Sequence, residues 1–436
     1  MSHAEDLSAA RPKHPFGLYV LFLTEMWERF GFYTMLAVFT LFLKDTQQDG
    51  LGWSAGDATG LYANYLMFVY ASPLIGGFIA DRNLGYRLSI LIGAIFFIAG
   101  YVLLTVPSVG TLYLALALLV IGNGFFKPNI STLVGNLYPS GSPLRDSAYN
   151  IFYMGINIGA FMAPLVAEVV RQRYGFRFAF GAAAVGMTIG LVVFAVLQKF
   201  VASADRPKAA KAPASESVAV AEDLPPRPEE ALTAIDSVPE WKRVSALIVV
   251  FAIVIVFWMV FHQNGSTMTY WANDNTDWSS SQVTPILIQM FTLGMVDGSD
   301  VSGVISNAIN PFWIIVLSIP LVRFWRYLNV KGLEPSTPAK MGLGMLLTAL
   351  AFTILGIGGL SGGDVGKVSP WWIIGAYGVL SLGELMLSPM GLSLVSKVAP
   401  ARMRGLLMGG WFVATAIGNK LTMIGIYWTR WSHSSF

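Results

Sequence analysis

The chain has 436 residues, of which 55% are hydrophobic and only 12% are charged. A soluble domain carries about 25% charged residues, so this composition indicates an integral membrane protein. Because the chain contains no cysteine, disulfides, thiolate metal sites and cysteine nucleophiles are excluded. The 28 basic residues, set against 25 acidic ones, are scattered between apolar runs, which fits the loops of a membrane protein and not a nucleic-acid surface.

Apolar runs of about 20 residues, enough to cross a bilayer as a helix, recur along the whole chain. The first 15 residues are polar, lack an apolar core and do not form a cleavable signal peptide. The candidate spans that follow are residues 16–43, 54–80, 87–106, 111–137, 147–170, 177–200, 243–270, 303–328, 340–360, 370–396 and 403–429. We therefore predict an all-α membrane protein with eleven readable spans.

Residues 202–240 interrupt this pattern. They are rich in Ala, Pro and Glu and nearly free of large apolar side chains, which predicts a flexible cytoplasmic linker. The predicted organisation is an N-terminal tail (1–15), a six-helix bundle (16–201), the linker (202–240) and a C-terminal bundle (241–436). The sequence stops at "RWSHSSF", where a twelfth span would enter the membrane, so we expect the natural chain to continue. The polar loop 272–300 is expected to hold a short helix, "VTPILIQMF".

The distribution of Lys and Arg predicts the orientation. If the N-terminus is cytoplasmic, most of the 28 basic residues fall in cytoplasmic segments, as the positive-inside rule requires. The cluster from Arg171 to Arg177 runs against the rule. We predict a multi-pass protein of the inner (plasma) membrane with its N-terminus inside.

The first span contains the unusual run "TEMWERFGFY". One face of a helix would carry six residues of this span, Glu25, Glu28, Arg29, Phe32, Tyr33 and Leu36. Each charge at mid-membrane costs roughly 2.5–3.5 kcal/mol on insertion scales, so these side chains must pair inside the bundle. Two carboxylates against one guanidinium leave an acid in excess, which is suited to loading and unloading a proton. A fully satisfied structural ion network is the alternative.

Three further polar residues lie within spans. Lys127 lies in span four and is followed by Pro128, which is expected to break or bend the helix. Glu384 lies in span ten, and its charge is opposite to that of Lys127. A Lys127–Glu384 pair across the two halves would neutralise both, whereas separate local partners are the alternative. In "FYMGINIGAF" the glycines indicate helix packing, and Asn157 is the better candidate for function.

The segment "GGFIADRNLGYR" joins spans two and three. Its residues Gly77, Asp81, Arg82, Gly85 and Arg87 resemble the loop signature of the major facilitator superfamily. The resemblance implies two six-helix bundles with alternating access. A plain basic loop that obeys the positive-inside rule is the alternative.

Four motifs together resemble the proton-dependent oligopeptide transporter (POT) family. They are "ExxERFxxY" in span one, "FFKPNIS" in span four, "FYMGINIGAF" in span five and "GELMLSPMGLSLVSKVAP" in span ten. They occur in the family's order and cover essentially the whole chain. The resemblance implies a proton-coupled symporter that imports di- and tripeptides, without the two extra helices that many bacterial members insert between the halves.

The resemblance also implies roles for individual residues. Glu25, Glu28 and Arg29 match the family's proton-coupling motif, Lys127 the lysine that couples protons to the peptide carboxylate, and Glu384 the acid that holds the peptide amino group. The positions that match the substrate pocket are Arg29, Tyr33, Tyr70, Lys127, Tyr153, Asn157, Trp258, Asn310, Glu384, Ser388, Trp411 and Phe412. No cofactor is implied, only the proton gradient, and the expected partners are the peptide, protons and the lipid bilayer, with the protein acting as a monomer.

The chain departs from the family at the expected outer gate. The family's second tyrosine and its gate arginine are replaced by Phe32 and Leu36, and the acid that pairs with this arginine is replaced by His262. The paired loss avoids an uncompensated buried charge. His262 either senses pH at the gate, since imidazole titrates near neutral pH, or is a neutral polar side chain in the bundle.

The alternatives to peptide symport are transport of another solute and a role as a sensor or membrane enzyme. The departures at Phe32 and Leu36 leave open a related transporter for a peptide-like or non-peptide solute, such as a drug, nitrate or a conjugated metabolite. A substrate sensor or membrane enzyme is disfavoured because the sequence has no metal-ligand cluster, nucleophile elbow or phosphate loop. We therefore expect a transporter and not an enzyme.

Overall fold

The computed structural model describes residues 14–433, apart from 48, 107, 140, 141, 143, 206–237, 300, 401 and 402. The predicted N-terminal tail and linker lie largely outside the described residues. In the described part of the chain, nine helical segments are long and apolar enough to cross a membrane. With α1 and α14, described below, they account for the eleven predicted spans, so the all-α membrane fold is confirmed.

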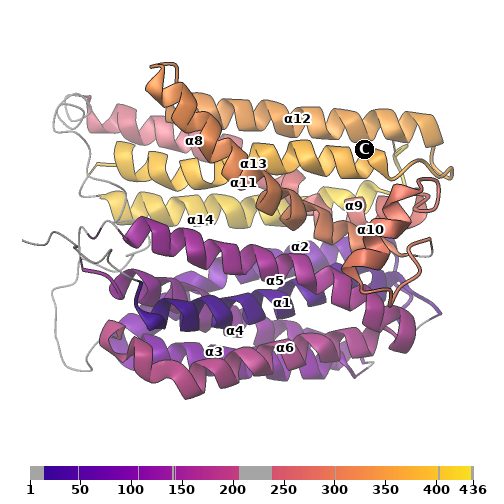
Figure 1. Ribbon diagram of the computed structural model, residues 1–436, viewed down its shortest axis with the longest axis horizontal. Helices are drawn as coiled ribbons and strands as arrows, with labels where there is room; N and C mark the ends of the chain where they lie inside the picture. The colour runs from indigo at the N-terminus through magenta and orange to yellow at the C-terminus, as the bar shows by residue number, and fades with distance from the viewer. Residues whose placement is uncertain are drawn as a thin grey trace, which may run out of the picture.

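The N-terminal half forms the lower group of helices in Figure 1. It consists of α1 (Phe16–Lys44), α2 (Ala55–Ile79), α3 (Tyr86–Leu104), α4 (Val109–Asn136), α5 (Arg145–Tyr174) and α6 (Phe176–Leu197). A π-helical turn, η1 (Ala80–Leu84), continues α2, and a 3-10 helix, η2 (Gln198–Ala204), continues α6.

The C-terminal half forms the upper group (Figure 1). It consists of α8 (Glu240–Phe261), η3 (His262–Gly265), α9 (Thr267–Asp274), α10 (Val283–Phe291), η4 (Gly303–Ala308), α11 (Ile309–Val330), α12 (Thr337–Gly362), α13 (Trp371–Val398), α14 (Arg404–Leu421) and η6 (Thr422–Tyr427). The short helix α10 covers the predicted "VTPILIQMF" segment. It lies beside α9 at one end of the bundle, on the right of Figure 1, and we call this end the α10 end.

Helix α1 is buried along nearly its whole length, because α5 and α6 pack closely along it. Close packing of α5 on α1 depends on glycine. A Cβ atom at Gly159 would collide with the carbonyl oxygen of Met26, and one at Gly155 would lie 2.9 Å from the Phe22 ring. The packing role predicted for the glycines of "FYMGINIGAF" is confirmed, and this contact holds the charged face of α1 inside the bundle.

Three boundaries differ from the sequence prediction. Helix α4 runs unbroken through Pro128, so of the two predicted outcomes, a break or a bend, the break does not occur. The predicted span 243–270 is divided at His262, where η3 separates α8 from α9, because Asn264 and Gly265 are poor helix formers. Helical structure also continues past the expected linker boundary at 202, since η2 extends to Ala204, which is buried.

Candidate functional site

The predicted charged face of α1 forms a compact ion cluster with α4. Glu25 and Glu28 are fully buried and Arg29 is 7% exposed. The Arg29 guanidinium donates two hydrogen bonds to Glu28, one of them 2.6 Å long, and lies 3.6 Å from Glu25. Lys127 of α4 forms an ion pair with Glu25 Oε1. Two acids and two bases thus meet in the N-terminal half, which offsets the cost of burying each charge.

The expected pair between Lys127 and Glu384 is not formed in this structure. Lys127 is bound to Glu25, whereas Glu384 of α13 accepts a 2.9 Å hydrogen bond from Asn310 of α11. Asn310 also donates to the hydroxyl of Ser381, one turn before Glu384. The alternative of separate local partners is therefore the one observed, and the C-terminal half presents its own acid independently of the cluster on α1.

One oxygen of the ion cluster is unusual. Glu25 Oε2 is buried and has no hydrogen-bond partner among the described residues. Both oxygens of Glu28, in contrast, accept hydrogen bonds from Arg29. A buried carboxylate oxygen without a donor is costly, and a proton bound there would displace no existing hydrogen bond. The geometry thus distinguishes the two glutamates, which the sequence treats alike.

Three tyrosines of the N-terminal half lie within electrostatic range of Glu384. The carboxylate acts electrostatically on the hydroxyl groups of Tyr33, Tyr70 and Tyr153, which come from α1, α2 and α5. Asn157 donates to the backbone carbonyl of Tyr153 at 2.9 Å. Predicted pocket residues of both halves thus lie within electrostatic range of one acid, whose observed hydrogen-bond partner is Asn310.

The remaining predicted pocket residues lie on the C-terminal side. Trp258 is buried and its indole N–H has no partner among the described residues. Trp411 is buried against Phe251, with ring centroids 6.4 Å apart, while Ser388 and Phe412 are half-buried.

His262 connects the two halves. Its Nδ1 lies 3.1 Å from the carbonyl oxygen of Trp258, and its Nε2 lies 3.4 Å from the hydroxyl of Tyr70. Since a carbonyl oxygen can only accept, Nδ1 carries the proton and Nε2 accepts from Tyr70. Both ring nitrogens are thus satisfied in the neutral imidazole.

Phe32 and Leu36, the other two predicted gate residues, are both buried. The Arg29 guanidinium lies 4.7 Å above the Phe32 ring, so Phe32 contacts the ion cluster directly. The aromatic ring provides a cation–π contact at the position where the sequence predicted only a lost gate tyrosine.

The predicted loop motif lies at the end of the bundle opposite α10. Gly85 has φ +78°, a backbone conformation that favours glycine, and Asp81 accepts a 3.0 Å hydrogen bond from the Tyr86 hydroxyl. Arg87 pairs at 2.8 Å with Asp205, which follows η2. Gly77 packs near the Pro128 ring, and Arg82 lies 4.2 Å above the Phe78 ring.

Sequence reasoning missed two acids. Asp205 accepts backbone N–H bonds from Tyr86 and Arg87 and so caps α3. Glu168 of α5 is fully buried and contacts both halves at the α10 end. Asp205 fell at the edge of the predicted linker. Glu168 is a lone charge within an apolar run, close to the arginines from Arg171 to Arg177 that run against the positive-inside rule. A buried acid could have been predicted from that pattern.

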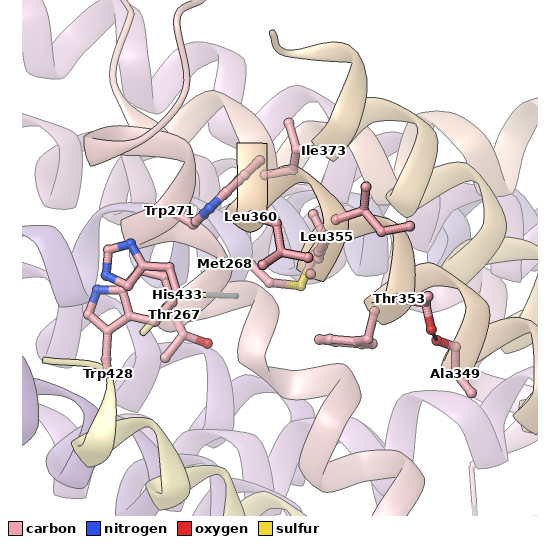
Figure 2. A pocket seen from close by; sticks show the side chains of 13 residues that line it. Thr267, Met268, Trp271, Ala349, Thr353, Leu355, Leu360, Ile373, Trp428 and His433 are labelled. Carbon is pink, nitrogen blue, oxygen red and sulfur yellow. Dashed lines mark hydrogen bonds between the residues drawn. The ribbon is translucent and has the colours of Figure 1, made fainter. Parts of the chain in front are cut away.

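An apolar cavity of about 470 Å³ lies elsewhere, on the C-terminal half. Figure 2 shows Trp271 and Met268 of α9 and Leu355 of α12 lining it, with Trp428 and His433 at one side. It contains none of the predicted site residues. Among the described residues no group of three His, Asp or Glu side chains is placed to hold a metal ion.

The chain is similar to known proteins over most of its length. The profile of the POT family matches residues 87–222 and 229–435. The chain is 31% identical to the di-/tripeptide transporter of Lactococcus lactis subsp. cremoris, over 93% of this chain and 88% of that protein. It is 30% identical to dipeptide and tripeptide permease A of Escherichia coli (strain K12), over 96% of this chain and 85% of that protein.

Solved structures are similar over the same extent. A mutant of the peptide transporter POT in complex with alafosfalin matches with a TM-score of 0.79 and 31% identity, covering 96% of this chain and 89% of that one. A POT family transporter in complex with a thioalcohol conjugated peptide matches with a TM-score of 0.79 and 26% identity, covering 94% and 90%. The chain therefore belongs to the POT family, and its two helical bundles have the major facilitator fold that the sequence predicts.

Proposed function

We propose that the protein is a proton-coupled symporter that imports di- and tripeptides by alternating access. It would reside in the inner membrane as a monomer, with its N-terminus in the cytoplasm. The relatives named as di- and tripeptide transporters support the substrate class. The single observation that carries the proposal is the separation of charge in the site. Arg29 and Lys127 lie in one half, and Glu384 lies in the other without a cationic partner among the described residues.

This separation suits the two ends of a peptide. The peptide carboxylate would bind Arg29 and Lys127, and its ammonium group would bind Glu384 and Asn310. Tyr33, Tyr70, Tyr153 and Trp258 would contact the side chains, with the other predicted pocket positions around them. Charged groups that hold the shared termini, together with aromatic walls, suit a pocket that accepts many side chains.

Proton coupling would act through competition within the ion cluster. In this structure both bases are bound to carboxylates. A proton from outside would bind the unpartnered Oε2 of Glu25 and neutralise that acid. Lys127 would then be released to bind the peptide carboxylate. Proton and peptide would leave together on the inside, after which Lys127 returns to Glu25.

Uptake by purified protein in proteoliposomes tests the proposal. We expect peptide accumulation that depends on an imposed inward proton gradient. Lys127→Ala should lower gradient-driven uptake at least tenfold while keeping part of the exchange between labelled and unlabelled peptide, because only the coupling base is lost. The exposed Lys199 provides the matched control Lys199→Ala. Uptake that ignores the gradient would refute symport, and normal driven uptake by Lys127→Ala would refute its role.

Two variants, Glu25→Gln and Glu28→Gln, test whether the proton binds Glu25. Glu25→Gln should uncouple uptake from the gradient, and Glu28→Gln should chiefly weaken peptide binding because Arg29 loses the carboxylate that positions it. The reverse pattern would assign the proton to Glu28.

A second candidate, transport of a peptide-like or non-peptide solute, is favoured by one observation. A related solved structure is a POT family transporter in complex with 5-aminolevulinic acid. Competition of unlabelled dipeptides and of 5-aminolevulinic acid against labelled substrate would separate the two. If only the non-peptide competes, the second candidate is correct.

A further inference from the structure

Glu168 joins the two halves at the α10 end through a fully buried carboxylate. Its carboxylate accepts 2.8 Å and 2.6 Å hydrogen bonds from the backbone N–H and the hydroxyl of Ser302, which precedes η4. Glu168 belongs to the N-terminal half and Ser302 to the C-terminal half. The side chain of Glu168 is fully buried, so its carboxylate is shielded from water, whereas Ser302 is half-buried.

The same carboxylate also has partners on its own helix. Arg171 donates to both of its oxygens at 3.0 Å, and Gln172 donates at 3.1 Å. These partners stay with α5 when the halves move. Opening the α10 end would therefore separate Glu168 from two donors but would not leave a bare charge, which is the costly outcome for a buried carboxylate. The contact can break and form again without a large electrostatic penalty.

Three other contacts between the halves at this end are either exposed to solvent or uncharged at the acceptor. Lys44 and Asp274 lie 3.5 Å apart, but their side chains are 23% and 46% exposed, and such exposed pairs contribute little. Arg173 donates to the carbonyl of Met295 at the surface. Thr40 donates a neutral bond of 2.9 Å to the carbonyl of Gly265. Of these, Glu168 alone offers a charged acceptor shielded from water, and hydrogen bonds to charged groups are the stronger ones.

A polar cavity lies beside this contact. Its volume is about 410 Å³, and its lining includes Lys44, Arg171, Asn273, Asp274 and Ser302. Water in it can reach Ser302 and Arg171 as soon as the halves part, so the separated donors would be solvated at once. This again favours a contact that opens and closes over one that is permanent.

We infer that Glu168 and Ser302 form the latch that holds the α10 end closed, so that their separation accompanies opening of the entrance. The inference rests on the alternating access proposed above. It assigns a gate function to a residue pair on α5 and before η4, away from the predicted gate residues Phe32, Leu36 and His262.

Spin-label distances across the α10 end test the latch without substrate or a proton gradient. The chain has no cysteine, so cysteines introduced at Tyr174 and Leu293 would be the only labelled sites. These residues are 63% and 82% exposed and flank the contact between Arg173 and Met295. The parent chain should show mainly the short, closed distance.

Substitution of either partner of the contact should remove the latch. Ser302→Ala and Glu168→Gln should each raise the ratio of open to closed distances about tenfold, which corresponds to about 1.4 kcal/mol. The double variant should shift no further than the larger single change, because both act through one contact. The control is Ser306→Ala, since Ser306 is buried in the same 3-10 helix and its hydroxyl donates to the carbonyl of Gly303 within η4. It should keep the parent distribution.

Unchanged distances in both single variants would overturn the latch. So would additive effects in the double variant, or an equal shift in Ser306→Ala, which would indicate general damage to η4. Should Ser302→Ala fail to fold, Glu168→Gln still decides, because it keeps the Ser302 hydroxyl, which caps η4 by accepting a 3.2 Å hydrogen bond from the Val304 N–H. The result is independent of the cargo. Uptake assays that refuted peptide transport would not affect the conclusion from the distance shifts. Unchanged distances would refute the latch but would not affect the proposal of peptide symport.

Discussion

At the scale of single residues, the arrangement of the site follows from the ion pairs and hydrogen bonds that its buried charged side chains form. The sequence places two acids and one base on one face of α1, which leaves an acid in excess. The structure supplies the fourth charge from α4, because Lys127 binds Glu25. The resulting cluster has no net charge, which makes its burial in the membrane tolerable. Glu384 follows a different rule, since its observed partner is the neutral Asn310.

His262 provides a prediction at this scale. Its two ring nitrogens are satisfied in the neutral form by the Trp258 carbonyl and the Tyr70 hydroxyl. Protonation of Nε2 would remove the acceptor of the Tyr70 hydroxyl and break the present hydrogen bond. We expect His262→Gln, whose amide also has both a donor and an acceptor, to leave the pH profile of uptake unchanged. The measurement is initial uptake rate in proteoliposomes from about pH 5 to 8, the range in which an ordinary imidazole titrates.

The control for this measurement is His262→Phe, which removes both hydrogen bonds and should lower the rate at every pH. If His262→Gln instead flattened or displaced the profile, pH sensing by the imidazole would be the correct alternative.

At the scale of elements, the helices are positioned by small residues and by acids outside the predicted site. Gly159 lets α5 approach α1 closely enough to touch its backbone, which holds the charged face of α1 inside the bundle. Asp205 binds the start of α3 and Arg87 together, so the loop motif between α2 and α3 is fixed to the chain that follows η2. Both contacts act on the site indirectly, by fixing the helices that carry it.

Gly159 gives the prediction for this scale. Gly159→Ala places a methyl group against the Met26 carbonyl, where backbone cannot yield easily, and overpacking of this kind costs typically 1–3 kcal/mol. We expect a lower melting temperature in detergent and lower uptake. Gly181→Ala is the matched control, because a Cβ atom there has nothing within 4 Å. It should melt at the parent temperature or slightly above, since alanine favours helix more than glycine does.

Equal melting temperatures for Gly159→Ala and the parent would contradict the close approach of α5 to α1.

At the scale of the whole molecule, two bundles meet along α2 and α14 and are joined at the α10 end. Helices α2 and α14 lie side by side at the border between the halves (Figure 1). At the α10 end Glu168, Lys44 and Thr40 of the first half all contact the second. In this structure the molecule is thus closed at this end, which in the proposed orientation faces the outside of the cell.

The proposed orientation can be tested with single cysteines, because the chain has none of its own. A cysteine at Leu293, between α10 and η4, should react in intact cells with a thiol reagent that does not cross membranes. A cysteine at Val330, at the end of α11, should react only after the cells are opened. Both residues are more than 80% exposed (82% and 81%), so exposure within the protein does not explain a difference. The reverse labelling pattern would place the N-terminus outside.

The sequence by itself determined the membrane class, the eleven spans, the short helix α10 and the family, because these depend on local composition and on motifs contiguous in the chain. It also identified Glu25, Glu28, Arg29, Lys127 and Glu384, since a charge in an apolar run needs a partner wherever it lies.

Which partner each charge takes was decided only by the tertiary structure. Lys127 pairs with Glu25 and not with Glu384, and Glu168 pairs with Ser302 across 134 positions of the chain. Such pairings depend on the distances between packed helices, and these follow from contacts such as that of Gly159 with Met26, which a linear pattern does not contain.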